Sequence, residues 1–565
     1  MVTKSARPGS SVLSTTPQWS RVIPGSLSFG LAIGEHGELE YRGPTSSAVG
    51  ARLPAAPQRP INIAEMPAAL RALPDAEEMC HHLDLFMEWQ NSCVLILPGC
   101  SINSFMNAYP PSAEDVARRV VLWSILSLTY NMHGIGRLNY EDRVDRSDSA
   151  HAQATQLVMD LALRKPSVET VQSACLLACR EYSCGHENSA WVFHGIATTV
   201  GGSIGLHAGR DYNRWVASGH LSPRRVETRV VTYWALVLVD RMLGSCLGRN
   251  CLLHPTDFST AEIKLRVLAI STNKQDTTLV EGSPTYTNSV LNAFRCAVDL
   301  WKLTDEILSQ IYIWQHDLIR LRRDTRRLGV ILNKLSDVVK NAHAKYRAWK
   351  CSLPLELSFT RSGPLPHLLL LHMAYHSHQI LVHRPFLFLL HLSDNRDGLP
   401  PRSQDIAVSA PLICRESAFE IMNLCKTYRQ HYTSQCIVFI VVHFLLNACT
   451  IHIIDRDDAQ SETSREANVA LNDCLAILEE VATVWGIAGN TIALVNELKN
   501  THDNREGDNS AKLSVNTTAT ELENAETGAK TYGQAVFDGW DLFPHPQDVW
   551  SIALLEPYVT QMDVL

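Results

Sequence analysis

The stretch from Ser222 to Pro255 constrains the fold more than any other part of the chain, because it combines a long apolar run with clear end signals. Ser222 can cap a helix whose first residue is Pro223, where a missing backbone N–H costs nothing. The apolar residues between Val230 and Leu243 are not confined to one face of a helix, which predicts a helix buried on all sides. Gly248 can end this helix.

Charged residues lie at both ends of this apolar run. Glu227 and Arg229 stand near its start, and Asp240 and Arg241 near its end. A charge next to a buried segment needs a partner, since an unpaired buried charge is strongly unfavourable. We therefore expect Asp240 to pair with an arginine such as Arg249.

Length and composition describe an ordinary globular protein. The chain has 565 residues, of which 45% are hydrophobic and 19% charged, so a mostly disordered chain is excluded. With a net charge of −8, the protein lacks the positive field with which a free-standing DNA-binding protein attracts phosphate groups. Any role with nucleic acid is then local, or depends on a partner.

The cysteines and the apolar segments favour an intracellular protein that does not enter a membrane. Fifteen cysteines are scattered through helical patterns, which favours reduced thiols. The first 20 residues are polar and lack the apolar core of a secretory signal. The segment Cys436–Ile454 has roughly the length of a membrane span, but it contains His443 and Asn447, so we interpret it as a core helix.

The order of segments predicts an all-α protein. Residues 1–60 read as a flexible leader in which residues 37–47 form a short strand or a docked hairpin. Residues 61–500 read as a multi-helix body of antiparallel helix pairs around a buried central helix. Residues 501–531 are polar and predict a disordered linker, and residues 532–565 form a separate tail.

Local signals predict where several helices begin. They are Asp75 with Glu78, Ser112 with Asp115, and Ser167 after Pro166. Pro385 is expected to end or kink the helix of the histidine-rich segment Leu365–Leu392. Three glycines, Gly201, Gly202 and Gly205, are expected to let backbones approach closely.

The tail combines acidic and bulky apolar residues without a lysine or arginine. This composition is typical of transcriptional activation segments, in which charge keeps large apolar groups in solution until a partner binds them. A strap packed on the helical body is the alternative. The residues of the candidate activation segment are Phe537, Trp540, Leu542, Phe543 and Trp550.

Motifs for catalysis or metal binding are weak. His372 and His376 have the i, i+4 spacing of two metal ligands, but no third ligand joins them at a suitable spacing. The arginines Arg320, Arg322, Arg323, Arg326 and Arg327 form a basic stripe that reads as a solvated helix face, a phosphate-binding surface or a nuclear import signal. Asn472, Asp473 and Glu480 match part of the magnesium motif of class I terpene synthases, which are all-helical enzymes; Ala476 departs from it, and no aspartate-rich partner motif lies upstream. We interpret this helix as a charged surface helix.

Two central segments resemble the regulatory domain of fungal-specific transcription factors, in the branch of the nitrate-assimilation activators. The first match consists of Glu227, Arg229, Tyr233, Trp234, Asp240, Arg241, Gly248 and Arg249, with Asn250 where the family usually has proline. The second consists of Trp191, Gly195, Ala197, Gly205, Leu206, His207 and Asp211. With shorter matches the resemblance spans about residues 37–392.

The resemblance implies a nuclear, non-enzymatic regulator of transcription for one nutrient or biosynthetic pathway. Relatives hold two zinc ions in an N-terminal CxxCx6C cluster, but here no cysteine precedes Cys80 and no CxxC occurs. We therefore expect no cofactor in this chain, with zinc and DNA contact only through a missing N-terminal module or a partner. Expected partners are other transcription factors or coactivators, a small-molecule effector or a second copy in a homodimer, and no membrane. The alternatives are an interaction protein that sequesters a partner and a terpene-synthase-like enzyme.

Overall fold

The computed structural model describes most of the central chain. The described residues are 30–33, 39–42, 72–98, 105–106, 109–112, 115–132, 140–209, 212–254, 284–314, 325–357, 364–390, 401–456 and 461–500. The predicted linker, the tail with its five candidate activation residues, Asp211, and the arginines Arg320, Arg322 and Arg323 lie outside them.

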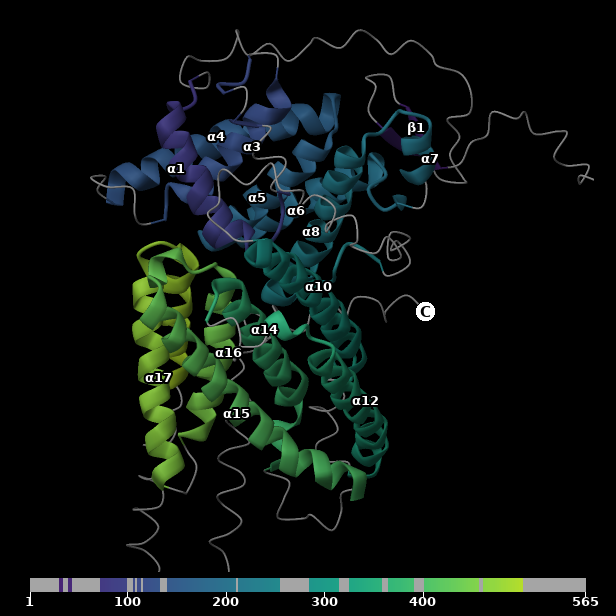
Figure 1. The fold of residues 1–565 in the computed structure, drawn as a ribbon. Coiled ribbons are helices and arrows are strands. Elements are labelled where there is room, and N and C mark those ends of the chain that lie inside the picture. The colour runs from purple at the N-terminus through teal and green to yellow at the C-terminus, as the bar shows by residue number, and fades with distance from the viewer. Residues whose placement is uncertain are drawn as a thin grey trace, which may run out of the picture.

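Helices make up nearly all of the described chain, and they fall into two halves (Figure 1). Helices α1 to α8 gather in the upper half of the figure, and α10 to α17 run through the lower half. The upper helices are α1 (Ala76–Leu85), the π-helix η4 (Phe86–Asn91), α3 (Val116–Thr129), α4 (Tyr140–Arg164), α5 (Val168–Ser183), α6 (Glu187–Ser203), α7 (Tyr212–Ala217) and α8 (Pro223–Leu247). The lower helices are α10 (Pro284–Tyr312), α12 (Thr325–Cys351), α14 (Pro366–His383), α15 (Pro401–His431), α16 (Ile440–Asp455), α17 (Ser461–Ala482) and a last helix over residues 486–500.

Consecutive helices pack against each other in pairs, as in α3 with α4, α5 with α6, α14 with α15, and α16 with α17. Helix α8 packs on α5 and α6 on one side and on α10 on the other, so it joins the two halves. It is long and apolar enough to cross a membrane by composition alone, yet 89% of its apolar window is buried in the protein. The predicted all-α fold with a buried central helix is confirmed.

A small hairpin is the one β element among the described residues. Strand β1 (Gly30–Ile33) pairs antiparallel with β2 (Leu39–Arg42), with Gly30 opposite Arg42, and β2 lies against α6. The short strand expected within residues 37–47 is therefore present, and it belongs to a docked hairpin.

The helix starts agree with the local signals, with one correction. Asp75 caps α1 by accepting from the backbone N–H of Glu78 (2.9 Å), and Ser167 caps α5. Asp115, not Ser112, caps α3, because its carboxylate accepts from the N–H of Arg118 (3.1 Å). Each cap satisfies one of the backbone donors that the first helical turn leaves unpaired.

Two further expectations for the lower half are confirmed. Helix α16 is buried almost throughout, as expected of a core helix. Helix α14 ends at His383, two residues before Pro385, and continues as the 3₁₀-helix η9 (Arg384–Leu390). The boundaries predicted at residues 60, 500 and 531 stay predictions.

Candidate functional site

Helix α8 provides the framework of the site, and its ends are set as the sequence predicts. The Ser222 hydroxyl accepts from the N–H of Arg225 (3.2 Å), and Pro223 occupies the first turn. Gly248 ends the helix with φ = 60°, a left-handed conformation that glycine adopts without the clash of a Cβ.

Asp240 is the centre of a buried polar network near the end of α8. Its side chain is fully buried, and each carboxylate oxygen accepts two hydrogen bonds. Oδ1 accepts from His194 Nε2 on α6 (2.7 Å) and from the N–H of Leu252 (2.9 Å). Oδ2 accepts from Arg241 and from the N–H of Leu253 (3.1 Å). The loop that follows α8 is thereby fixed to both α6 and α8.

Asp240 pairs with an arginine as expected, but Arg249, the arginine given as an example, is not that partner. Arg241 takes this role, because its long side chain reaches the neighbouring carboxylate although adjacent helix residues point in different directions. Arg249 donates to the side-chain oxygen of Asn188 (2.8 Å) and lies 5.5 Å from the ring centre of Trp191. Arg249 therefore holds the surface side of α6.

Arg241 extends the network to α10. Its Nη2 donates to the carbonyl of Leu253 (2.8 Å), and its Nε lies 3.6 Å from Oδ2 of Asp305. The Cys251 thiol donates to the other oxygen of Asp305 (3.6 Å). Burial raises the pKa of Asp305, and the positive charge of Arg241 opposes this shift. The network thus connects α6, α8, α10 and residues 251–253.

A second polar contact fixes the other end of α8. Arg229 donates through Nε to the hydroxyl of Tyr212 (3.2 Å) and through Nη2 to the carbonyl of Ile204, while its guanidinium lies 5.4 Å from the Tyr212 ring centre. Glu227 is buried near the same end. Both ends of α8 therefore use buried charge to hold the chain around α6 and α7.

The remaining predicted residues surround these two contacts. Trp234 is buried, with Lys302 Nζ 5.1 Å from its ring centre, and Trp191 and His207 are half-buried. Gly205 adopts φ = 67° just after α6. Of the glycines expected at close backbone approaches, Gly201 is tight, since an added Cβ would lie 3.0 Å from Leu236 Cδ2. The expectation is wrong for Gly202, which has open space.

The sequence analysis missed three polar residues of the network, Cys251, Asp305 and His194, of which only His194 contacts the Asp240 carboxylate with its side chain. His194 lies on the buried face of α6 and contacts Asp240 from 46 residues away. A single histidine among Phe193, Ala197 and Val200, which are all buried, is the signal that could have identified it.

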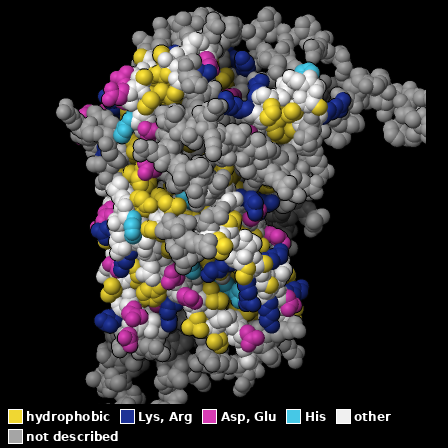
Figure 2. Space-filling view, in the orientation of Figure 1, with side chains coloured by type: hydrophobic (Ala, Val, Ile, Leu, Met, Phe, Trp, Pro, Cys, Tyr) yellow, Lys and Arg dark blue, Asp and Glu magenta, His cyan; other side chains and the backbone are white. Residues whose placement is uncertain are grey.

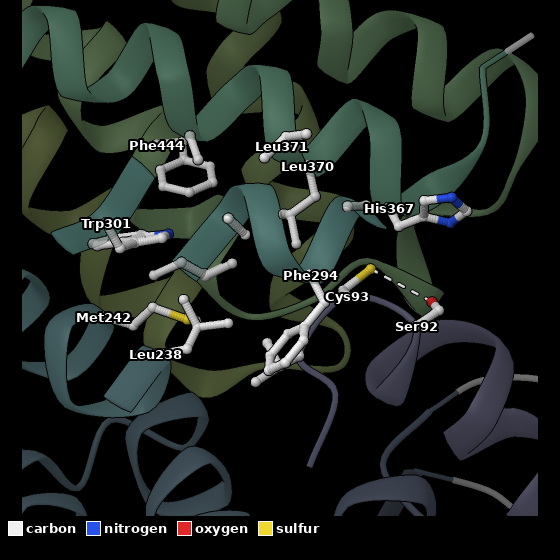
Figure 3. Close-up of a pocket in the computed structure, with 15 residues that line it drawn as sticks. Ser92, Cys93, Leu238, Met242, Phe294, Trp301, His367, Leu370, Leu371 and Phe444 are labelled. Carbon is white, nitrogen blue, oxygen red and sulfur yellow. Dashed lines mark hydrogen bonds between the residues drawn. The ribbon is translucent and has the colours of Figure 1, made fainter. Parts of the chain in front are cut away.

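An apolar pocket lies where the two halves meet (Figure 3). Its cavity volume is only about 20 Å³, room for about one water molecule. Its wall comes from α8, α10, α14, α16 and the loop after η4. Met242, Phe294, Trp301 and Phe444 line it. Burial lowers the pKa of His367, at one edge, to about 4, so its imidazole is neutral at pH 7.

The alternative chemical sites do not assemble. His372 faces the carbonyl of Leu357 (3.4 Å), and no group of three potential metal ligands occurs among the described residues. On α17, Asp473 pairs with Lys426 (2.5 Å), and Glu480 accepts from Ser434 (2.7 Å). These carboxylates hold α17 to neighbouring segments, which fits a charged structural helix.

Comparison with known proteins agrees with the resemblance. Residues 83–344 match the family described as the fungal specific transcription factor domain. The nitrogen assimilation transcription factor nirA of Emericella nidulans is 27% identical over 363 residues, 62% of this chain and 37% of that protein. The nitrogen assimilation transcription factor nit-4 of Neurospora crassa is 25% identical over 63% of this chain and 30% of its own length.

A more distant relative has a different role. The activator of stress genes 1 of Saccharomyces cerevisiae is 22% identical over 330 residues, 54% of this chain. The match thus spans only about a third of the length of each of these three relatives. No solved structure matches the chain.

Proposed function

Because residues 83–344 form a fungal specific transcription factor domain, we propose that this chain regulates transcription of the genes of one nutrient or biosynthetic pathway, and that its helical body is the regulatory part. The protein acts in the nucleus and has no enzymatic activity in this proposal. Regulators of nitrogen assimilation and of stress genes are among its relatives.

The observation that carries the proposal is the location of the resembling residues. Asp240, Arg241 and Arg229 hold the ends of α8, and their polar atoms bond to the surrounding helices and loops. Residues that fix a fold without contacting solvent support a shared regulatory domain rather than a shared reaction. In the Asp240 network, donors from the protein itself occupy both carboxylate oxygens.

The proposed partners are coactivators or other transcription factors, with contact to DNA through a partner or a further module. A small-molecule effector would bind at the apolar pocket between the halves, where Met242, Phe294, Trp301 and Phe444 would move apart to admit it. A homodimer is a further proposed state. The chain itself needs no cofactor in this proposal.

The test is a fusion of the full chain to a heterologous DNA-binding domain upstream of a reporter gene. We expect the fusion to activate the reporter, and deletion of residues 532–565 to reduce the activity. Immunoblots of each fusion control for the amount of protein. A silent fusion at normal protein level contradicts the role as activator.

Two further outcomes separate the alternatives. Repression of a full-length relative's target genes on overexpression would instead identify an interaction protein that sequesters partners. Magnesium-dependent turnover of a prenyl diphosphate, lost in Asp473→Ala, would identify an enzyme.

A further inference from the structure

Helix α12 presents a strongly basic exposed face. Between Thr325 and Cys351 it carries seven lysines and arginines and one acidic residue, Asp337, in a protein of net charge −8. Its apolar face is turned inward, since Leu328, Leu332, Leu335 and Val339 are at most 1% exposed. The charged side chains therefore lie along the outside, where dark blue groups gather on the α12 side of the lower half in Figure 2.

The exposed face is a continuous row along the helix. At steps of three and four residues it contains Arg327, Val330, Lys334, Asp337, Lys340, Ala344 and Arg347, all exposed. We call this row the α12 outer face. Among the described residues, neither Lys340 nor Arg347 forms an ion pair. Lys345, on the flank, is instead occupied by Glu306 (2.6 Å).

One end of the α12 outer face is apolar as well as basic. Val330 is 59% exposed and Ile313, at the end of α10, is 53% exposed. Trp314 lies beside them, with Lys334 Nζ 4.9 Å from its ring centre. Large exposed apolar side chains next to basic ones suit a ligand that has both acidic and apolar groups.

One segment of the same chain has this complementary composition. Residues 532–565 contain five acidic groups, no lysine or arginine, and six aromatic residues. The described chain ends at residue 500, and the 31 residues of 501–531 can span up to about 100 Å when extended. The segment can therefore reach any face of the helical body, and its tether keeps its effective concentration high.

We propose that residues 532–565 dock on the α12 outer face of their own chain. Their acidic groups face Lys334, Lys340 and Arg347, and their aromatic groups cover Val330, Ile313 and Trp314. A tethered acidic segment fits this face better than nucleic acid does, because the net negative charge of the protein repels a free polyanion and phosphates leave the apolar end uncovered.

The contact has a regulatory consequence that rests on the proposed function. If the segment recruits a coactivator through its aromatic groups, docking hides part of those groups and lowers activation until a signal releases the segment. The contact itself does not depend on that role, so it can be measured separately.

The full chain is treated with a carbodiimide, which joins carboxylates to lysine amines that are in direct contact with them. Mixing ¹⁵N-labelled and unlabelled protein distinguishes cross-links within one chain from those between chains by mass spectrometry. We expect cross-links within one chain from the acidic residues of 532–565 to Lys334 and Lys340. In Lys340→Ala/Arg347→Glu, with Lys334 kept as the reporting amine, the yield at Lys334 should fall about five-fold or more, and raising the salt should lower it in the wild type.

The matched control is Arg164→Glu/Lys165→Glu, two exposed residues at the end of α4, which should leave the cross-links unchanged. Cross-links only to other lysines, cross-links only between chains, or a yield insensitive to the charge reversal would overturn the proposal. Binding of duplex DNA to this face in place of the tail would identify a phosphate-binding surface and would also overturn it.

The reporter fusion separates the two proposals. Lys340→Ala/Arg347→Glu should raise reporter activity several-fold if docking restrains activation. Cross-links in the wild type, together with a reporter that stays silent in Lys340→Ala/Arg347→Glu as well, would leave the docking intact and contradict the activator role. An active reporter without cross-links would overturn the docking and leave the activator role intact.

Discussion

Asp240 is fully buried, and its four hydrogen bonds explain how the fold tolerates a carboxylate there. Two come from side chains, His194 and Arg241, and two from backbone N–H groups of Leu252 and Leu253. Removing one member of such a network leaves the others buried without partners, which strongly destabilises the folded protein. Replacing the whole network by apolar side chains would cost less stability than removing one member.

Replacing Asp240 by alanine should therefore lower the free energy of unfolding by about 3 kcal/mol or more, because His194 and two buried backbone donors lose their acceptor and Arg241 loses its nearest carboxylate. Urea unfolding followed by circular dichroism at pH 7 measures the change. Asp337→Ala, at an exposed site, is the control and should have little effect. A loss of less than half the expected size for Asp240→Ala would show that the carboxylate is solvated.

The buried histidines should make stability depend on pH. Burial lowers the pKa of His378 to about 3, from the usual 6.5. Between these values the unfolded chain binds a proton at this site and the folded chain does not, so stability falls as the pH is lowered through this range.

His378→Gln removes that difference and can keep the hydrogen bond with Thr304 (2.8 Å). Between pH 6 and pH 5, the slope of the free energy of unfolding against pH should then be smaller than in the wild type by about 1.4 kcal/mol per pH unit, which is the contribution of one proton. Urea unfolding at several pH values tests this. An unchanged slope would mean that His378 is protonated in the folded protein.

Sequence reasoning at the residue scale identified Asp240 as buried, charged and paired with an arginine, but the arginine it gave as an example is not the partner. Arg249 follows the helix end and is turned to the surface by the left-handed Gly248. His194 is 46 positions away from Asp240, so only the packing of α6 on α8 brings the two together. Partners across helices depend on rotation and register, which a single sequence does not specify.

Whole elements were more predictable, because caps and end signals are local. Ser222, Pro223 and Gly248 define α8 within the chain segment itself. The pocket could not be predicted in this way, since its wall combines side chains from residues 92 to 444. Its shape results from tertiary packing alone.

Two glycines test how the interior and the end of a helix respond to an added methyl group. Gly195 lies inside α6, and an added Cβ there would meet no atom within 4 Å, so Gly195→Ala should stabilise the protein by about 0.5–1 kcal/mol through helix propensity. Gly248→Ala should instead destabilise it by about 1 kcal/mol, because alanine resists φ = 60°. Thermal unfolding midpoints measure both, and a shift in the same direction for the two variants would contradict this explanation.

The family match and the folded helical body cover different lengths of the chain. The match ends at residue 344, whereas the helical body continues to residue 500. Helices from the later part cover apolar surface of the earlier part: Trp301 on α10 contacts His378 on α14 (4.3 Å between ring centres) and stacks on Phe444 of α16 (6.5 Å). The pocket wall is shared in the same way.

A fragment of residues 72–351 should therefore not fold as an independent unit, although it contains the whole of the matched region. Without α14 and α16, the inner faces of α8 and α10 lose their cover, and exposed apolar surface of that extent favours aggregation. Size-exclusion chromatography and near-ultraviolet circular dichroism provide the measurement, with residues 72–500 as the matched control that should remain folded. If residues 72–351 instead unfold cooperatively with native near-ultraviolet signals, helices α14 to α17 are a separate domain, and their contacts with α8 and α10 contribute little to stability.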